Sequence, residues 1–200
     1  MNGWIYDALL ALAERKILGR LRSRLLEPLE GTIVEVGAGT GVDFRYFARR
    51  ANVIAFEPDP AMASRASEKL RLARASIELR IASDEALATL PPQSIDVVVF
   101  PLVLCTVSDP THTLRRAKRI LRPGGRIAIL EHVRGAGVRA RVQDAIAPVW
   151  GALAGGCHPN RDTRDLLERA GFDTCELASQ HLPGPSPIAD LLWGYARSRS

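Results

Sequence analysis

The sequence contains few cysteines and no long apolar run. Its three cysteines, Cys105, Cys157 and Cys175, are odd in number and lack the spacing of metal ligands, so we expect no metal site. No run of about 18 apolar residues occurs, which argues against a transmembrane helix, and the first residues lack the pattern of a signal peptide. We therefore expect a reduced, cytoplasmic setting.

Lysine is scarce as well, so the basic charge comes almost wholly from arginine. Lys16, Lys69 and Lys118 are the only lysines, although the formal net charge is +5. No basic patch interleaved with aromatic residues accompanies this charge, and we expect no nucleic-acid partner. The 46% hydrophobic and 24% charged content is ordinary for a globular enzyme, and 200 residues suffice for one domain with a sizeable core.

A glycine-rich turn is the most informative feature that the sequence does contain. The apolar, β-branched run 32–36 predicts a buried strand, and Gly37, Gly39 and Gly41 follow it directly. Glycine permits a tight turn and lets a ligand approach the backbone where a Cβ would clash. Backbone amides that point at such a turn can hold a polar ligand. Val42 stands where a dinucleotide fingerprint has its last glycine, so the turn favours S-adenosylmethionine (SAM), which has no pyrophosphate.

An acidic residue after the second predicted strand supports a nucleoside ligand. The apolar run 52–56 ends in Glu57, at the position where a nucleotide-binding βαβ unit holds the ribose hydroxyls. A free 2′-hydroxyl, as in SAM or NAD, would suit this carboxylate. The structural alternative is that Glu57 only caps the helix expected to begin near Pro60.

Strand and helix patterns alternate along the chain, which predicts an α/β fold. We expect a single doubly wound, mostly parallel seven-stranded sheet with helices on both faces. The expected strands are residues 32–36, 52–56, 77–81, 95–100, 126–130, 173–178 and 190–196. The expected helices are residues 4–27, 42–50, 61–73, 111–121, 138–153 and 162–170. We divide the chain into an N-terminal helix or lid, 1–30, and a catalytic domain, 31–200.

The first predicted helix carries several basic residues. The ordinary interpretation is that these residues form a solvent-exposed face of the helix. The alternative is that the helix forms a lid over the binding site or contacts an anionic membrane surface. The pair Tyr6–Asp7 resembles a pair found in the lids of many small-molecule methyltransferases, so we favour the lid. The basic residues in question are Arg15, Lys16, Arg20, Arg22 and Arg24.

These motifs, in this order, resemble the class I SAM-dependent methyltransferases over almost the whole chain. The matching segments are 35–41, Glu57–Pro58, 94–99 and 121–126. A narrower resemblance, to the alkyl thiol S-methyltransferases, is carried by residues 102–107, 131–133, 156–157, 161–163 and 194–196. That family has an N-terminal membrane anchor, which we do not expect here. It also has a cysteine where Ala38 stands. The resemblance implies SAM as cofactor and a small-molecule acceptor, with a thiol preferred.

The resemblance implies the following cofactor contacts. The methionine part of SAM would be surrounded by Glu35, Gly37, Ala38, Gly39 and Gly41, and its ribose held by Glu57. Pro58 and Met62 would lie at the adenine edge, and one of Ser83, Asp84 and Glu85 would accept from the adenine amine. Pro101 and Leu102 would face the sulfonium and begin the acceptor site.

Two histidines are candidates for ionising an acceptor thiol. His132 follows the fifth strand at the edge where such sheets bind ligands, and His158 lies in a glycine-rich loop. Either histidine could instead be structural, by packing or by lying in a loop without a role. Cys105, in an apolar context, is expected to be a small buried hydrophobe. Cys157 beside His158 provides only two ligands, too few for a metal site.

Three functions follow as hypotheses. The first is methyl transfer from SAM to a small thiol. The second is N-, O- or C-methylation of a lipid, quinone or secondary metabolite, which the basic first helix would suit. The third, from another class, is a SAM-binding protein without catalysis. The sequence does not decide the oligomeric state.

Overall fold

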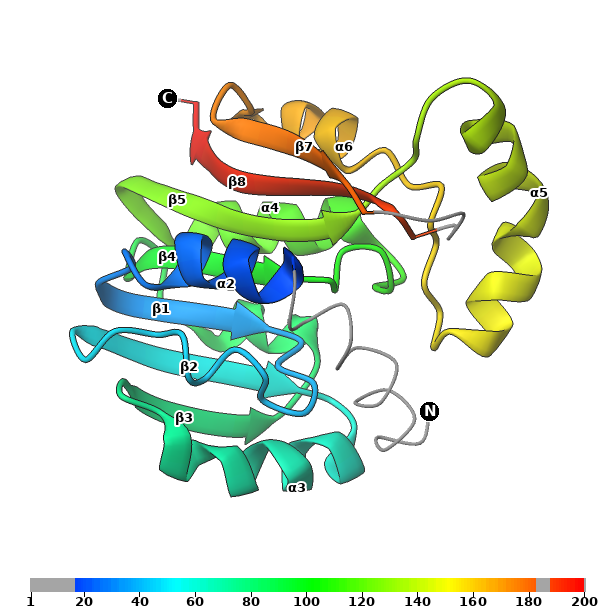
Figure 1. Cartoon of the computed structure of the whole chain (residues 1–200). Coiled ribbons are helices and arrows are strands. Elements are labelled where there is room, and N and C mark those ends of the chain that lie inside the picture. The colour runs from blue at the N-terminus through cyan, green and yellow to red at the C-terminus, as the bar shows by residue number, and fades with distance from the viewer. Residues whose placement is uncertain (1–16, 183–187, 200) are drawn as a thin grey trace.

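The computed structural model describes residues 17–182 and 188–199 and shows an α/β fold built on one sheet (Figure 1). The strands run in the order β3-β2-β1-β4-β5-β8-β6, and β7 also pairs with β8. Pairing is parallel from β3 through β5 and antiparallel wherever β8 takes part. The strands are β1 Gly31–Val36, β2 Ala51–Glu57, β3 Ser76–Ile81, β4 Ile95–Pro101, β5 Leu121–His132, β6 Phe172–Asp173, β7 Leu177–His181 and β8 Asp190–Ser198.

The doubly wound, mostly parallel sheet predicted from the sequence is confirmed, with eight strands in place of seven. The difference arises late in the chain, where the strand predicted at 173–178 is divided into β6 and β7. The polar stretch between them leaves the sheet for a turn, in which the amide of Leu177 donates to the carbonyl of Thr174. Both short strands then pair with β8.

Helices lie on both faces of the sheet. Figure 1 shows α2 in front of the sheet and α4 behind it, while α5 lies beyond the carboxyl ends of the parallel strands. The helices are α2 Gly19–Leu26, α3 Pro60–Lys69, α4 Pro110–Ile120, α5 Val138–Leu153 and α6 Thr163–Arg169. Within the described residues, no helix is both long and apolar enough to cross a membrane.

Two hydrophobic cores, one on each face, explain why β4 is apolar throughout. Successive side chains of a strand point to opposite faces, so Val98 packs in the core that includes Leu114 of α4. Val99 packs in the other core, with Leu25 of α2. A strand buried on both faces needs an unbroken apolar run, which places β4 at the centre of the sheet.

The helix predicted at 42–50 is wrong, because this segment forms a series of turns. The amide of Phe44 donates to the carbonyl of Gly41, three residues back, in place of the four-residue bond of an α-helix. Phe44 is fully buried beneath the turn, and the Asp43 carboxylate pairs with buried Arg22 at 2.5 Å. These tertiary contacts fix the segment against the sheet and override its local helical pattern.

The first predicted helix is described only from residue 17, and α2 ends near the predicted position. Tyr6 and Asp7 lie outside the described residues, as do Arg15 and Lys16. The interpretation as a solvent-exposed face is wrong for Arg22, whose side chain is 2% exposed. Arg20 and Arg24 are exposed, as expected.

Candidate active site

The glycine turn after β1 has the backbone geometry that its sequence predicts. Gly37, Gly39 and Gly41 have φ of 75°, 57° and 72°, in the left-handed region that favours glycine. A Cβ at Gly41 would meet the Phe44 ring at 2.8 Å and Ala66 at 3.0 Å, so Gly41 serves packing. Among the residues that the structure describes, and apart from its chain neighbours, none comes within 4 Å of a Cβ built at Gly39. Gly39 therefore borders open space, where a ligand can approach the backbone.

Glu57, at the end of β2, lies directly against this turn. Its carboxylate accepts from the amide of Gly39 at 2.7 Å and from the amide of Asp59 at 2.9 Å. Burial raises the pKa of Glu57, and these two backbone hydrogen bonds act in the opposite direction. The capping role considered for Glu57 belongs to Asp59, whose side chain accepts from the first amides of α3. Glu57 is thus left at the turn, with lone pairs still available.

Glu35, near the end of β1, is a fully buried acid beneath the turn. Neither oxygen of its carboxyl group has a hydrogen-bond partner among the described residues. Burial, and next the nearby charge of Asp43, hold the pKa of Glu35 well above its usual range, while Arg22 lowers it. The site therefore contains a buried polar group that a ligand could satisfy.

The loop after β3 contains the three candidates for the adenine amine. Ser83 accepts from the amide of Glu85 at 3.3 Å and so caps a short 3-10 helix. The Asp84 carboxylate accepts from Thr113 of α4 at 2.5 Å and lies 3.6 Å from Arg116. Both contacts of Asp84 with α4 use the same carboxylate oxygen. Glu85 is exposed. None of the three is excluded as the adenine contact, and that role stays a prediction.

The other predicted cofactor contacts lie at the ends of β2 and β4. Pro58 is exposed just after β2, and Met62 is buried in the first turn of α3. Pro101 is buried at the end of β4. Leu102 follows with φ of 61°, unusual for a branched residue, and its amide donates to the carbonyl of Leu130 at 2.6 Å. The backbone therefore turns sharply out of β4 at Leu102.

A buried carboxylate organises the loop 102–107 that follows β4. Glu131 of β5 accepts from the amides of Val103 at 2.8 Å, Leu104 at 2.7 Å and Cys105 at 3.2 Å. Burial raises the pKa of Glu131 to about 8, against the effect of these three hydrogen bonds. One side chain thus satisfies three successive loop amides, which fixes the path of the loop.

The same loop is held from the other side by the segment that follows α5. The Arg161 guanidinium donates to the carbonyls of Leu104 and Val107, the latter at 2.9 Å. The amide of His158 donates to the carbonyl of Cys105 at 2.8 Å, and its ring Nδ1 lies 3.3 Å from the same oxygen. His158 is exposed and contacts the loop backbone, which differs from the buried setting of His132.

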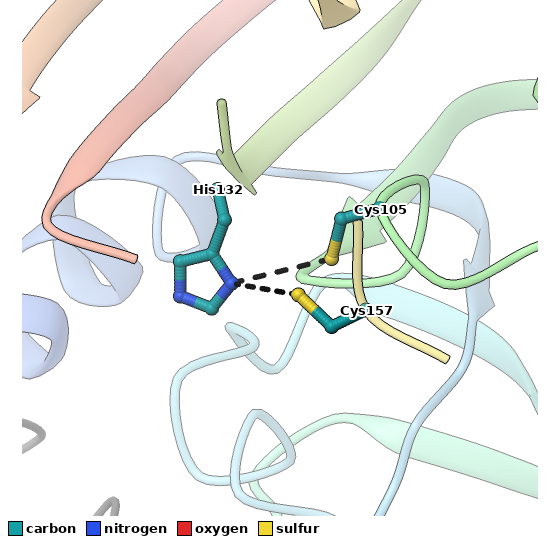
Figure 2. Close-up of side chains that lie close together, drawn as sticks. All are labelled: Cys105, His132 and Cys157. Atoms are coloured by element: carbon teal, nitrogen blue, oxygen red, sulfur yellow. Dashed lines mark hydrogen bonds between the residues drawn. The ribbon is translucent and has the colours of Figure 1, made fainter. Parts of the chain in front are cut away.

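His132, at the end of β5, faces two cysteine sulfurs with one ring nitrogen (Figure 2). Its Nδ1 is 4.0 Å from the Sγ of Cys105 and 4.0 Å from the Sγ of Cys157. All three residues are buried. A hydrogen bond from Cys105 and then the contact with His132 lower the pKa of Cys157 to about 5, against burial. The same bond, together with burial, raises the pKa of Cys105.

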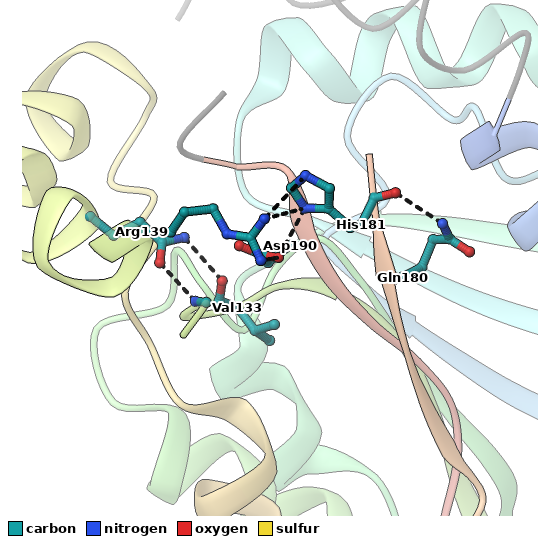
Figure 3. Close-up of polar contacts among 7 residues, drawn as sticks. Val133, Arg139, Gln180, His181 and Asp190 are labelled. Carbon is teal, nitrogen blue, oxygen red and sulfur yellow. Dashed lines mark hydrogen bonds and ion pairs between the residues drawn. The ribbon is translucent and has the colours of Figure 1, made fainter. Parts of the chain in front are cut away.

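Polar contacts fasten the start of α5 to the sheet (Figure 3). Asp190 of β8 lies 3.0 Å from the ring of His181 and 3.3 Å from the guanidinium of Arg139. Gln143 of α5 donates to the carbonyl of Val133 at 3.2 Å. These contacts position α5, whose far end leads into the loop that carries Cys157.

Comparison with known proteins identifies the class of this site. A family model described as a methyltransferase domain matches residues 34–129. The thiol S-methyltransferase TMT1A of Homo sapiens is 30% identical over 205 residues, which cover 96% of this chain and 81% of that protein. The chain belongs to the same methyltransferase family as TMT1A. TMT1B of Mus musculus is 34% identical over 167 residues, covering 79% of the chain and 68% of the relative.

A solved structure supports the same assignment at the level of the fold. The N-methyltransferase NodS of Bradyrhizobium japonicum, in complex with S-adenosylhomocysteine (SAH), superposes with a TM-score of 0.70. The match covers 94% of this chain and 88% of the NodS chain, and the two are 17% identical in sequence. The family match and the named relatives show that the protein is a SAM-dependent methyltransferase, as the resemblance of its ordered motifs implied.

The residues around the turn fit SAM. The buried carboxyl group of Glu35 lacks a partner and offers an acceptor for an ammonium group. Gly39 leaves the space that a Cβ would fill, and Glu57 can accept from ribose hydroxyls beside its two backbone bonds. The assignment of these residues to parts of SAM rests on the resemblance and on this chemical fit.

The cluster of Cys105, His132 and Cys157 was missed by the sequence analysis. The cysteines lie 27 and 25 residues from His132 in the chain, so no local spacing indicates that they meet. The only signal was that all three fall within segments that resemble the thiol methyltransferases. His132 was selected as a candidate, and the fold places it at the carboxyl edge of the sheet.

Proposed function

We propose that this methyltransferase transfers the methyl group of SAM to the thiol sulfur of a small molecule. The support is its similarity to TMT1A and TMT1B, which are named as thiol S-methyltransferases. The observation that carries the proposal is the placement of His132 and loop 102–107 beside the end of β4. In open α/β sheets, ligands bind outside the carboxyl ends of the strands.

SAM supplies an electrophilic methyl carbon on a sulfonium. The acceptor thiol must lose its proton; its sulfur then forms a bond to the methyl carbon while the bond to the sulfonium sulfur breaks, leaving SAH. Such an in-line displacement depends mainly on positioning and on exclusion of water. Glu35, Gly39 and Glu57 hold the donor side, while the fixed loop 102–107 borders the acceptor side.

The ionisation of the acceptor thiol is the step that needs chemical help, since a free thiol has a pKa of about 8.5. His132 is buried at the sheet edge and already contacts sulfur atoms, so we assign this help to His132. His158 is exposed and contacts the carbonyl of Cys105. We assign to His158 the positioning of the loop, in place of proton transfer.

The experiment incubates the full chain with labelled SAM and a panel of alkyl thiols. His132→Ala should lower the rate of S-methylation about a hundred-fold at neutral pH, the lower range for acid–base assistance. The loss should shrink at high pH, where solvent ionises the thiol unaided. His112→Ala, a change at an exposed histidine of α4, is the matched control and should leave the rate unchanged.

Two results would contradict the proposal. Methylation of a lipid, quinone or amine with thiols inert would show that the acceptor class is wrong. Tight SAM binding without turnover on any acceptor would show a binding protein. If both His132→Ala and His158→Ala kept full activity on thiols, catalysis would rest on positioning and desolvation alone.

A further inference from the structure

Two cysteines and one histidine from distant parts of the chain meet at the carboxyl edge of the sheet. Cys105 comes from the loop after β4, His132 from the end of β5 and Cys157 from the loop after α5. Their ligand atoms all lie within 4.8 Å of one another, and all three residues are buried. Figure 2 shows one ring nitrogen of His132 directed at both sulfurs.

We propose that Cys105, His132 and Cys157 bind one Zn²⁺ ion and that its fourth position takes the sulfur of the acceptor thiol. Cysteine sulfur and histidine nitrogen are the ligands that zinc prefers, and catalytic zinc sites keep three protein ligands and one open position. The second half of this proposal rests on the proposed function, because it names how the acceptor is held.

The distances suit such a site after small adjustments. With zinc bonds of about 2.3 Å to sulfur and about 2.0 Å to nitrogen, tetrahedral angles place sulfur and nitrogen about 3.5 Å apart. The present distances from Nδ1 to the two sulfurs are both 4.0 Å. Each ligand would have to move by only about half an ångström, which a side-chain rotation can supply.

The backbone around two of the ligands is already fixed. Glu131 accepts from the amide of Cys105, and the amide of His158 donates to its carbonyl. On the other side, the amide of Cys157 donates to the carbonyl of Ala154. These hydrogen bonds hold the backbone of both cysteines in place. Charge also balances, since two thiolates and a neutral imidazole offset a divalent cation.

The chemistry of the fourth position is simple. When a thiol binds, its S–H bond breaks, the proton passes to solvent and the sulfur electron pair forms a bond to zinc. The help with thiol ionisation that the proposed function assigns to His132 would then act through the metal that His132 holds. A thiol is preferred over an alcohol or an amine because zinc in a thiolate-rich site favours sulfur.

The test uses Zn²⁺ and Co²⁺ as probes of the full chain after removal of metal with a chelator. We expect one equivalent of either ion, and visible and charge-transfer absorption of a tetrahedral thiolate site with Co²⁺. His132→Ala and Cys157→Ser should each weaken metal binding at least ten-fold. Cys175→Ser, at an exposed cysteine, is the matched control and should bind as the unaltered protein does. Retained SAH binding, measured by calorimetry, shows that each variant is folded.

Absence of metal binding, or equal binding by folded Cys157→Ser protein, would overturn the site. So would a Cys105–Cys157 disulfide that forms in place of metal uptake. An alkyl thiol added to the Co²⁺ form should increase the charge-transfer absorption and release one proton, whereas the matching alcohol should do neither. Unchanged absorption would overturn the assignment of the fourth position.

The same preparations separate this inference from the proposed function. If metal-free enzyme methylates thiols as fast as metal-loaded enzyme, the proposed function stands and the zinc inference fails. If metal-loaded enzyme binds the thiol but never forms its S-methyl product, the zinc site stands and the proposed function fails.

Discussion

At the scale of single residues, the donor site depends on a few buried groups around one glycine turn. Glu57 both braces this turn and remains able to accept further hydrogen bonds. Glu35 is a buried acid without a partner among the described residues. Gly39 faces open space. Each feature leads to a separate prediction about SAM binding.

Glu57→Ala should weaken the binding of SAM and SAH at least ten-fold. Hydrogen bonds to a charged group contribute about 1.5–3 kcal/mol each, and this change removes those to the ribose together with the brace on Gly39. Glu57→Gln keeps a carbonyl acceptor and should lose less. Isothermal calorimetry with SAH measures both, with exposed Glu30→Ala as control. Unaltered SAH affinity in folded Glu57→Ala protein would show that the ribose lies elsewhere.

Gly39→Val should abolish SAH binding while the protein stays folded. The added side chain would enter the space where the ligand approaches, although the positive φ at this position adds some strain. Gly41→Val is the contrasting variant, because its Cβ would collide with Phe44 and Ala66. Thermal unfolding should show a much larger loss of stability for Gly41→Val. Normal SAH binding by Gly39→Val would contradict the placement of the ligand.

Glu35→Gln should stabilise the free protein increasingly as the pH rises. The pKa of Glu35 is raised in the folded state, so its favourable contribution is fully present below the ordinary pKa of about 4.5 and is lost as the pH rises toward the folded value. An amide removes this loss, yet it should weaken SAH binding because it accepts an ammonium group less well. Urea unfolding from pH 4 to 8 measures the first effect. A stability difference that does not change with pH would contradict the assignment.

At the scale of structural elements, loop 102–107 follows β4 and borders the proposed acceptor side. Glu131 holds its amides, and Arg161 holds two of its carbonyls. The two side chains approach the loop from different elements, so they fix it jointly. The loop is therefore held from two sides, and the contacts of Arg161 can be removed without altering Val103, the loop residue that faces Gly37.

Arg161→Ala should lower kcat/KM for the acceptor about ten-fold or more and leave SAH affinity unchanged. It removes two hydrogen bonds of about 0.5–3 kcal/mol each from the carbonyls of Leu104 and Val107, whereas the loop meets the glycine turn at Val103. Steady-state kinetics and SAH calorimetry measure the two effects separately. Arg169→Ala, at an exposed ion pair of α6, is the control. A parallel loss of SAH affinity would show that the loop does not act on the acceptor alone.

The elements also show how far sequence reasoning reaches. The strand β4 was predictable, because burial on both faces requires an unbroken apolar run. The segment 42–50 was not, because its turns depend on the pairing of Asp43 with Arg22 from another element. Likewise, Glu57 and the glycine turn could be found from local spacing. The meeting of Cys105, His132 and Cys157 depends on how β4, β5 and α5 come together in space.

At the scale of the whole molecule, the order of the strands explains where the two groups of site residues lie. β1 lies between β2 and β4, so the glycine turn and Glu57 lie side by side at one part of the carboxyl edge. β4 and β5 are neighbours, which brings loop 102–107 next to His132. The proposed donor and acceptor sides thus lie along one edge, supported by the same two cores.

The most direct test of this account is a competition between acceptors. The full chain is incubated with labelled SAM and equal amounts of an alkyl thiol, the alcohol and the amine of the same chain length, and the products are identified by mass spectrometry. We predict the S-methyl thioether as the methylated product, formed in equal amount with SAH, and no methylation of the alcohol or amine. Methylation of the alcohol or amine with the thiol left intact would contradict the central claim.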